Sequence, residues 1–174
     1  MLALALMSTA LLTPIEVTVR PGDDGVTSVT ASVVIDAPAT MIWSVMTDCK
    51  AALKTVPHLK ECVITEQSAD GRSDVRRHGI RYGGILPYTV NEFRSYYIFP
   101  STITFERTGG DLKVMEGEWS LQALPGGETV VTYRVHLGLG VPVPRILIAR
   151  AIKRDTRLIL ERLKVMAEHP EGVV

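Results

Sequence analysis

Residues 144–168 read PRILIARAIKRDTRLILERLKVMAE, and this stretch decides the fold. Apolar or weakly polar side chains recur along it at steps of three and four residues, which is the spacing of one face of an α-helix. The pattern predicts one long amphipathic helix, whose start is set by Pro142 and Pro144. Its apolar stripe consists of Ile148, Ile152, Thr156, Ile159, Leu163 and Met166.

The chain before this helix is mostly β-structure. Apolar and polar side chains alternate over residues 28–35, as in a half-buried strand. Two short helical pieces follow, one around Ile42 and Met46 and one over residues 51–56. Clusters of Gly, Pro, Asp and Ser then divide the sequence into six further strands. We expect these strands at residues 59–67, 74–82, 89–99, 102–108, 112–124 and 129–139.

This order of elements predicts an α+β fold. We expect a curved antiparallel sheet of about seven strands, two short helices after the first strand, and a long C-terminal helix over the sheet. The apolar face of such a sheet has to be covered, and only the C-terminal helix is long enough to cover it. A curved sheet that grips one helix leaves a space, so we expect an apolar cavity between them. Without repeats or a linker, residues 15–170 are expected to form a single domain.

Composition and motifs exclude several classes of protein. The 174 residues include 19 basic and 19 acidic ones, so the formal net charge is zero. Nucleic-acid-binding proteins usually carry a basic excess, and we therefore expect no nucleic-acid partner. There is no phosphate-binding loop and no nucleophile elbow. The four histidines lack metal-type spacing, and two cysteines cannot make a four-thiolate zinc site, so we expect neither a metal nor another cofactor.

The first residues, 1–14, read MLALALMSTALLTP and are apolar and uncharged. They resemble the apolar part of a secretory signal, with small residues at Ser8, Thr9 and Ala10, but they lack the positively charged start. Two interpretations stay open, a truncated signal and a frayed, docked or disordered leader. With a signal the protein would be periplasmic or secreted, and without one it would be cytoplasmic.

Several stretches carry a family resemblance. Residues 33–48, VVIDAPATMIWSVMTD, look like a first strand and helix, and residues 56–59 with 62–64 look like a proline joint leading into a second strand. Residues 117–121, 126–133 and 141–144 look like the last two strands and the junction before the helix. Together they resemble the START-like, or helix-grip, superfamily, and within it the polyketide cyclase/dehydrase and coenzyme Q-binding group. The resemblance spans most of residues 29–167.

That resemblance implies a deep apolar cavity, often with a bound lipid, quinone or polyketide-like molecule. Some members of the group are aromatase/cyclases, and others only bind and carry ligands, so the fold alone does not choose between them. Alternation along the expected strands indicates which side chains face inward. The candidate cavity residues are Trp43, Arg76, His78, Ile80, Tyr82, Asn91, Phe93, Tyr97, Phe105, Trp119, Tyr133, Ile152 and Ile159.

No catalytic residue can be assigned from these positions, although His78 and Arg76 are the candidates. His78 is either a general acid or base or a hydrogen-bonded histidine near the sheet edge. We favour the second interpretation because no inward carboxylate is identifiable that would orient the ring. Arg76 is either a ligand for a carboxylate, phosphate or quinone oxygen, or a side chain that reaches solvent.

Two turns are unusually apolar, residues 83–88 and residues 139–144. In the resembling fold such loops lie near one end of the cavity, where they would touch a membrane transiently or gate a lipid. The alternative is that they pack on each other or on the helix. The same fold brings the regions of Cys49 and Cys62 together, so a disulfide is conceivable there. In a cytoplasmic protein both residues would stay thiols.

The sequence therefore favours a protein that binds, and either transports or sequesters, a hydrophobic small molecule in an internal cavity. The first alternative is an enzyme of the cyclase/dehydrase type that uses polar residues of the cavity. The second is a non-catalytic module for membrane or protein interaction. Of these alternatives, we favour a binding protein over an enzyme.

Overall fold

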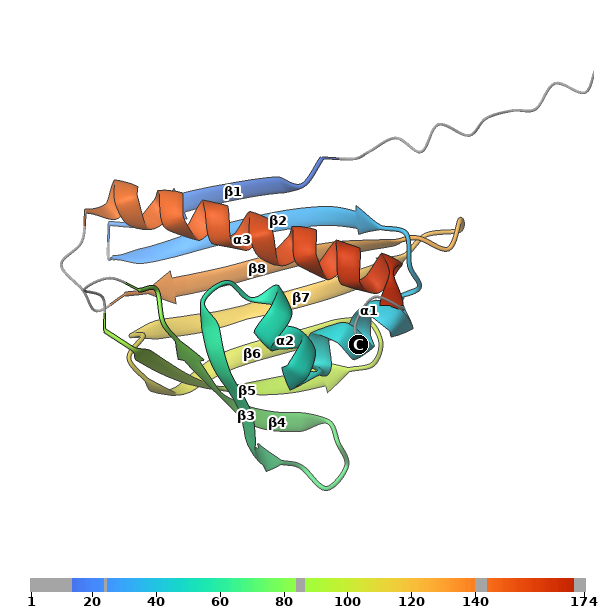
Figure 1. Cartoon of the computed structure of the whole chain (residues 1–174), viewed down its shortest axis with the longest axis horizontal. Helices are drawn as coiled ribbons and strands as arrows, with labels where there is room; N and C mark the ends of the chain where they lie inside the picture. Colours follow the sequence, from blue (N-terminus) through green and yellow to red (C-terminus); the bar gives the residue numbers. More distant parts are fainter. Residues whose placement is uncertain (1–13, 24, 84–86, 140–143, 171–174) are drawn as a thin grey trace, which may run out of the picture.

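A computed structural model describes residues 14–23, 25–83, 87–139 and 144–170. Its eight strands form one antiparallel sheet in the order β1-β2-β8-β7-β6-β5-β4-β3, and three helices accompany the sheet (Figure 1). The elements are β1 (Glu16–Pro21), β2 (Val26–Ile35), α1 (Ala39–Thr47), α2 (Cys49–Thr55), β3 (Leu59–Gln67), β4 (Ser73–Ile80), β5 (Thr89–Ile98), β6 (Thr102–Gly110), β7 (Val114–Ala123), β8 (Thr129–Gly138) and α3 (Arg145–Glu168).

The predicted α+β helix-grip arrangement is confirmed, with one strand more than expected. The additional strand, β1, pairs with β2 from Glu16 opposite Ser32 to Pro21 opposite Thr27. Strands β1 and β2 therefore form an antiparallel pair at one edge of the sheet. Val17 and Val19 alternate with polar neighbours, which is the ordinary signal of a half-buried strand.

The long helix α3 lies over one face of the sheet, alongside β1 and β2 (Figure 1). Its C-terminal half packs on the hydrophobic core, where Leu160 is fully buried together with Ile35 and Val131. Glu168 then holds the end of the helix by accepting a hydrogen bond from the backbone N–H of Asp36, at 2.8 Å. Lys164 donates to the backbone oxygen of Val34, at 2.9 Å. These contacts fix one half of α3 against β2.

The short helices α1 and α2 cover the other end of the sheet. Asp48 separates them and caps α2, since its carboxylate accepts hydrogen bonds from the backbone N–H groups of Lys50 and Ala51, at 3.0 and 3.3 Å. Cys49, the first residue of α2, forms a disulfide with Cys62 of β3, and their Cα atoms are 5.3 Å apart. Because β3 is an edge strand of the sheet, this bond attaches α2 to that edge.

No helix in the described ranges is long and apolar enough to cross a membrane.

Candidate functional site

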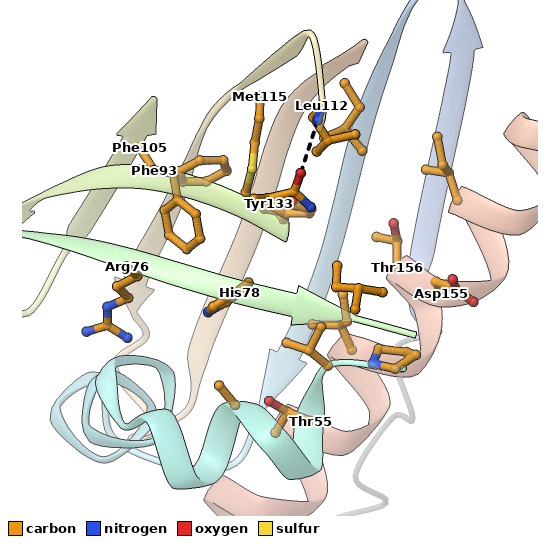
Figure 2. A pocket seen from close by; sticks show the side chains of 18 of the residues that line it. Thr55, Arg76, His78, Phe93, Phe105, Leu112, Met115, Tyr133, Asp155 and Thr156 are labelled. Carbon is orange, nitrogen blue, oxygen red and sulfur yellow. Dashed lines mark hydrogen bonds between the residues drawn. The ribbon is translucent and has the colours of Figure 1, made fainter. Parts of the chain in front are cut away.

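A cavity of about 620 Å³ lies between α2, the N-terminal half of α3 and the inner face of the sheet. Strands β4 and β5 supply one wall, and β6, β7 and β8 the floor. Figure 2 shows Arg76 and His78 on β4, Phe93 and Phe105 beyond them, Thr55 on α2 and Thr156 on α3. The volume lies within the range of ligand-binding pockets, about 300–1,000 Å³. Most lining side chains are aliphatic or aromatic.

Twelve of the candidate residues from the sequence lie in the lining of this cavity. They are Arg76, His78, Ile80, Tyr82, Asn91, Phe93, Tyr97, Phe105, Trp119, Tyr133, Ile152 and Ile159. Strand alternation placed the β-sheet members on the inner face, and the three- and four-residue spacing of α3 placed Ile152 and Ile159 there.

Trp43 is the exception and does not line the cavity. Its ring makes edge-on contacts with Tyr97 and Phe99, with ring centroids 5.8 and 5.5 Å apart. The residues of α1 that line the cavity are Met46 and Thr47, one helical turn further along. Trp43 therefore packs past the end of the cavity, over the turn between β5 and β6.

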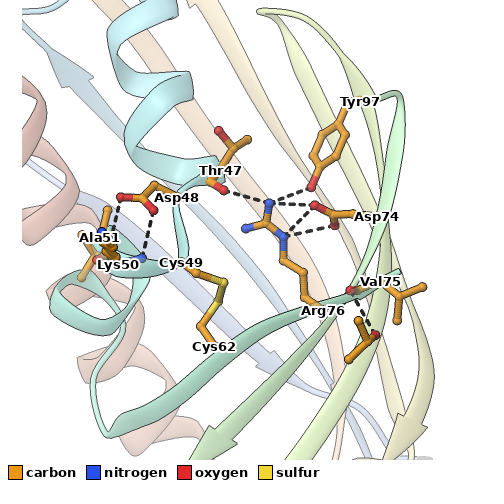
Figure 3. The surroundings of a disulfide bond; sticks show 12 residues. Thr47, Asp48, Cys49, Lys50, Ala51, Cys62, Asp74, Val75, Arg76 and Tyr97 are labelled. Carbon is orange, nitrogen blue, oxygen red and sulfur yellow. Dashed lines mark hydrogen bonds and ion pairs between the residues drawn. A yellow bond between two sulfur atoms is a disulfide. The ribbon is translucent and has the colours of Figure 1, made fainter. Parts of the chain in front are cut away.

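Arg76 takes part in a buried polar network at the α1 end of the cavity (Figure 3). Its guanidinium donates through Nε and Nη2 to the carboxylate of Asp74, with the closest distance 2.8 Å. Nη2 also donates to the backbone oxygen of Thr47, at 2.9 Å, and contacts the hydroxyl of Tyr97, at 3.0 Å. Only 7% of the Arg76 side chain and 2% of the Asp74 side chain are exposed. The positive charge of Arg76 is thus compensated by Asp74 within the protein itself, without a ligand.

Asp74 is the buried partner of Arg76 and was not among the candidate residues. It lies two residues before Arg76 and on the same side of β4, so strand alternation alone predicts that it faces inward. The expectation that no inward carboxylate exists was therefore wrong. Asp74 bonds Arg76, not His78, and so does not supply the orienting partner that a catalytic histidine needs.

His78 has no side-chain hydrogen-bond partner among the described residues, so the favoured interpretation of a hydrogen-bonded histidine was wrong. Its Nε2 is buried, and its ring packs edge-on against Phe93 with centroids 4.8 Å apart. Desolvation by burial lowers the pKa of His78 to about 4, and the nearby Arg76 cation acts in the same direction, against an opposite effect of Asp74. The ring is consequently neutral at physiological pH.

We expect the His78 imidazole to stay neutral from pH 8 down to pH 5, because its pKa in the folded protein is about 4. In the unfolded chain it should titrate near 6.5. Since the folded pKa is the lower one, the contribution of His78 to stability is complete above about pH 6.5 and declines as the pH falls towards 4. NMR titration of the ring signals, in buffer and in urea, measures both values. A midpoint above 6 in the folded protein would contradict the buried environment.

Three tyrosine hydroxyls reach the cavity and remain protonated there. Burial raises the pKa of Tyr97 to about 12 although the Arg76 cation opposes this, and burial also raises the pKa of Tyr133 and Tyr82. Proton abstraction by a tyrosinate is therefore not available at neutral pH, and these hydroxyls act as hydrogen-bonding groups.

The cavity meets the surface at the end opposite Arg76. Tyr82, Pro87, Asp111 and Leu147 belong to its lining and are exposed. This rim lies beside the two apolar turns that the sequence singled out. Residues 84–86 and 140–143 of those turns lie outside the described residues. The flanking residues Tyr88 and Ile146 are exposed as well.

Comparisons with known proteins agree with this architecture. A search of curated protein sequences finds no match. An aromatase/cyclase from a Streptomyces species has a TM-score of 0.71 and 17% identity, over 84% of this chain and 96% of that chain. A START superfamily protein from Mycobacterium smegmatis has a TM-score of 0.71 and 22% identity, over 82% and 98%. A STAR-related lipid transfer protein from Xanthomonas axonopodis has a TM-score of 0.69 and 13% identity, over 87% and 98%.

Because the sequence identities are only 13% to 22%, these structural matches establish the fold alone. The sequence match is more specific, because residues 35–164 match a family described as polyketide cyclase / dehydrase and lipid transport. That range includes α1, α2, strands β3 to β8 and most of α3, and so contains nearly all of the cavity wall. The chain belongs to the polyketide cyclase / dehydrase and lipid transport family, with the START-like helix-grip fold.

Proposed function

We propose that the protein binds a hydrophobic small molecule in this cavity and carries or sequesters it without changing it chemically. The observation that supports the proposal is an apolar cavity of about 620 Å³ whose buried cation is already paired within the protein. Burial of apolar surface supplies the affinity, at roughly 25 cal/mol per Å² before the costs of association. The lipid transfer relative supports the same kind of ligand.

A cyclase/dehydrase reaction is the second candidate, and the inward position of His78 and Arg76 favours it. Both residues would have to act on a bound substrate. However, the described partners of Arg76 already occupy Nε and Nη2, and His78 has no carboxylate to orient it. We therefore rank turnover below binding. A reaction would appear as a mass change in a bound polyketide-like compound.

We also propose that the rim of the cavity touches a membrane transiently. Tyr82 and Leu147 are exposed at the opening, and Ile146 is exposed beside Leu147. Arg150 lies on the next turn of α3, and Arg145, which is paired with Asp23, precedes Ile146. Such a surface suits the boundary of an anionic bilayer. Sedimentation with anionic and with neutral vesicles tests the contact. Equal recovery in the supernatant with both would count against it.

Native mass spectrometry of the protein from its own host, followed by organic extraction, tests the main proposal. A lipid, quinone or polyketide retained by the protein would identify the ligand class. The same mass reports whether Cys49 and Cys62 are joined. A protein without extractable ligand that also fails to bind a neutral hydrocarbon probe would contradict the proposal and favour an interaction module.

Filling the cavity should weaken binding of such a probe. Ala151 lies on the cavity side of α3, so Ala151→Phe places a ring inside the space. We expect the affinity for the fluorescent hydrocarbon diphenylhexatriene to fall at least about tenfold, which corresponds to the loss of roughly 1.4 kcal/mol of binding free energy. The matched control is Arg150→Phe, which adds the same ring to an exposed position outside the lining. Equal affinities of the two variants would show that the probe binds elsewhere.

A further inference from the structure

Two polar side chains of the cavity wall lie directly opposite each other on neighbouring strands. His78 of β4 pairs in register with Asn91 of β5, and both line the cavity. Side chains of directly opposite residues have Cβ atoms about 4.5–5.5 Å apart on the same face of a sheet. The two groups can therefore contact the same ligand atom. They lie between the Arg76 network and the exposed rim.

The orientation of the Asn91 amide follows from its one described hydrogen bond. The backbone N–H of Leu112 donates to Oδ1 of Asn91, at 3.1 Å. Since an N–H can only donate, the atom opposite it must be the amide oxygen, which makes the other atom the NH₂ group. Asn91 is 5% exposed, and its NH₂ has no partner among the described residues. Two hydrogen-bond donors are thus left open within the cavity wall.

His78 complements these donors. Neither ring nitrogen bonds a described residue, although Nε2 is buried. Because Nε2 is buried, the ring nitrogen that a ligand can reach is Nδ1, which is not among the buried unpaired atoms of the described residues. A neutral imidazole carries its proton on one nitrogen, so Nδ1 is a donor in one tautomer and an acceptor in the other. Such a polar atom in a cavity wall is expected to find a partner in water or a ligand, and beside the Asn91 amide it can bind the same oxygen atom.

The charges around the cavity select against an anion. The Arg76 cation is compensated by Asp74. The other charged residues in the described lining are Asp111 and Asp155, both acidic. A carboxylate ligand would therefore pass Asp111 and also Asp155, whose charge is paired with the exposed Arg154. It would find no uncompensated cation at His78. Transfer of an unpaired carboxylate into such a site is strongly unfavourable.

We propose that His78 and Asn91 form a subsite for the carbonyl or hydroxyl oxygen of a neutral, otherwise apolar ligand. The proposal rests on the proposed binding function and adds the chemical class of the ligand. A carbonyl oxygen accepts from the NH₂ of Asn91 and from the N–H of His78. A hydroxyl accepts from Asn91 and donates to the lone pair of the imidazole. An ester or ketone lacking a charge meets the same requirement.

Competition between matched probes tests this selectivity. Diphenylhexatriene, which has no polar atom, is bound first and then displaced by a long-chain methyl ketone, the secondary alcohol of the same chain, or the carboxylate of the same chain length. We expect the ketone and the alcohol to compete at concentrations at least about tenfold lower than the carboxylate. Equal competition by all three compounds would overturn the subsite. It would mean that water alone, and no ligand oxygen, binds at His78 and Asn91.

Variants assign the effect to the two residues. His78→Leu should lower the ratio of ketone affinity to diphenylhexatriene affinity about fivefold to tenfold, which is the usual value of one hydrogen bond. His78→Gln keeps a donor and an acceptor and should recover most of that loss. Asn91→Asp keeps the oxygen that Leu112 needs and removes the donors, so it should also weaken ketone binding. Glu92→Gln, on the outer face of β5 and outside the cavity lining, is the control and should change neither affinity.

The outcomes separate the two proposals. Diphenylhexatriene binding with ketone selectivity that is lost in His78→Leu supports both. Diphenylhexatriene binding without selectivity, or with selectivity that survives in both His78→Leu and Asn91→Asp, overturns the subsite and leaves the binding function standing. No binding of diphenylhexatriene by the folded protein overturns both.

Discussion

Replacing Asp74 with alanine should lower the free energy of unfolding by about 3–5 kcal/mol, because it leaves the buried Arg76 cation without its counter-charge. The two side chains are 2% and 7% exposed, so water cannot take the place of the carboxylate without structural change. Thr47 and Tyr97 would remain as partners of the guanidinium, and both are neutral. Urea unfolding at pH 7, with the disulfide intact, measures the loss.

Two further variants give this measurement its controls. Glu118→Ala removes the carboxylate of an exposed ion pair, Glu118 with Arg134, and should cost less than about 1 kcal/mol. Removing both charges of the buried pair, with Asp74→Leu and Arg76→Met together, should recover most of the stability lost in the single variant. A loss below about 1 kcal/mol for Asp74→Ala would mean that solvent reaches Arg76. The charge argument against anionic ligands would then fail.

The same variant connects stability to ligand selectivity. Once Asp74 is gone, Arg76 becomes an uncompensated cation at the inner end of the cavity. A long-chain carboxylate would then be able to pair with Arg76, which in the native protein is already paired with Asp74. Improved competition by the carboxylate in a folded Asp74→Ala protein would show that internal pairing, and not cavity shape, keeps anions out.

The inner face of the sheet was predictable because strand alternation depends only on local sequence. His78, Asn91, Phe93 and Tyr133 follow from it without knowledge of strand order. The position of Asp74 follows from the same rule, yet a carboxylate on a buried face contradicts the expectation that charges are exposed. The ion pair with Arg76 compensates the charge, and the approach of Thr47 and Tyr97 from other elements supplies further partners for the guanidinium.

Other features depend on tertiary structure and could not be predicted from local patterns. Trp43 has the size and apolar character of a cavity residue. However, it lies about one helical turn before the α1 residues that line the cavity, and it packs against Tyr97 and Phe99 instead. The pairing of His78 with Asn91 depends on the register between β4 and β5, and the free donors of Asn91 depend on the backbone of Leu112. Sequence patterns give the face of a side chain but not its partner.

Reduction of the disulfide between Cys49 and Cys62 should lower the free energy of unfolding by about 3 kcal/mol, the value expected when a crosslink closes a short loop in the unfolded chain. The two residues are 13 positions apart. The loop they close contains the whole of α2 and the start of β3, and α2 contributes Ala52 and Thr55 to the cavity wall. Urea unfolding with and without reductant measures the difference.

The double variant Cys49→Ala and Cys62→Ala is the matched control, since it should match the reduced protein and show no response to reductant. Hydrogen exchange adds a spatial test. The bond attaches α2 to an edge strand that has a sheet neighbour on one side only, β4. Without the disulfide, the protection of backbone amides from hydrogen exchange should therefore fall first in α2 and β3. The amides of β2 and β8, in the centre of the core, should keep their protection. A uniform loss of protection would show that the crosslink acts on the unfolded chain alone. A loss confined to α2 and β3 would show that it also holds the cavity wall closed in the native state.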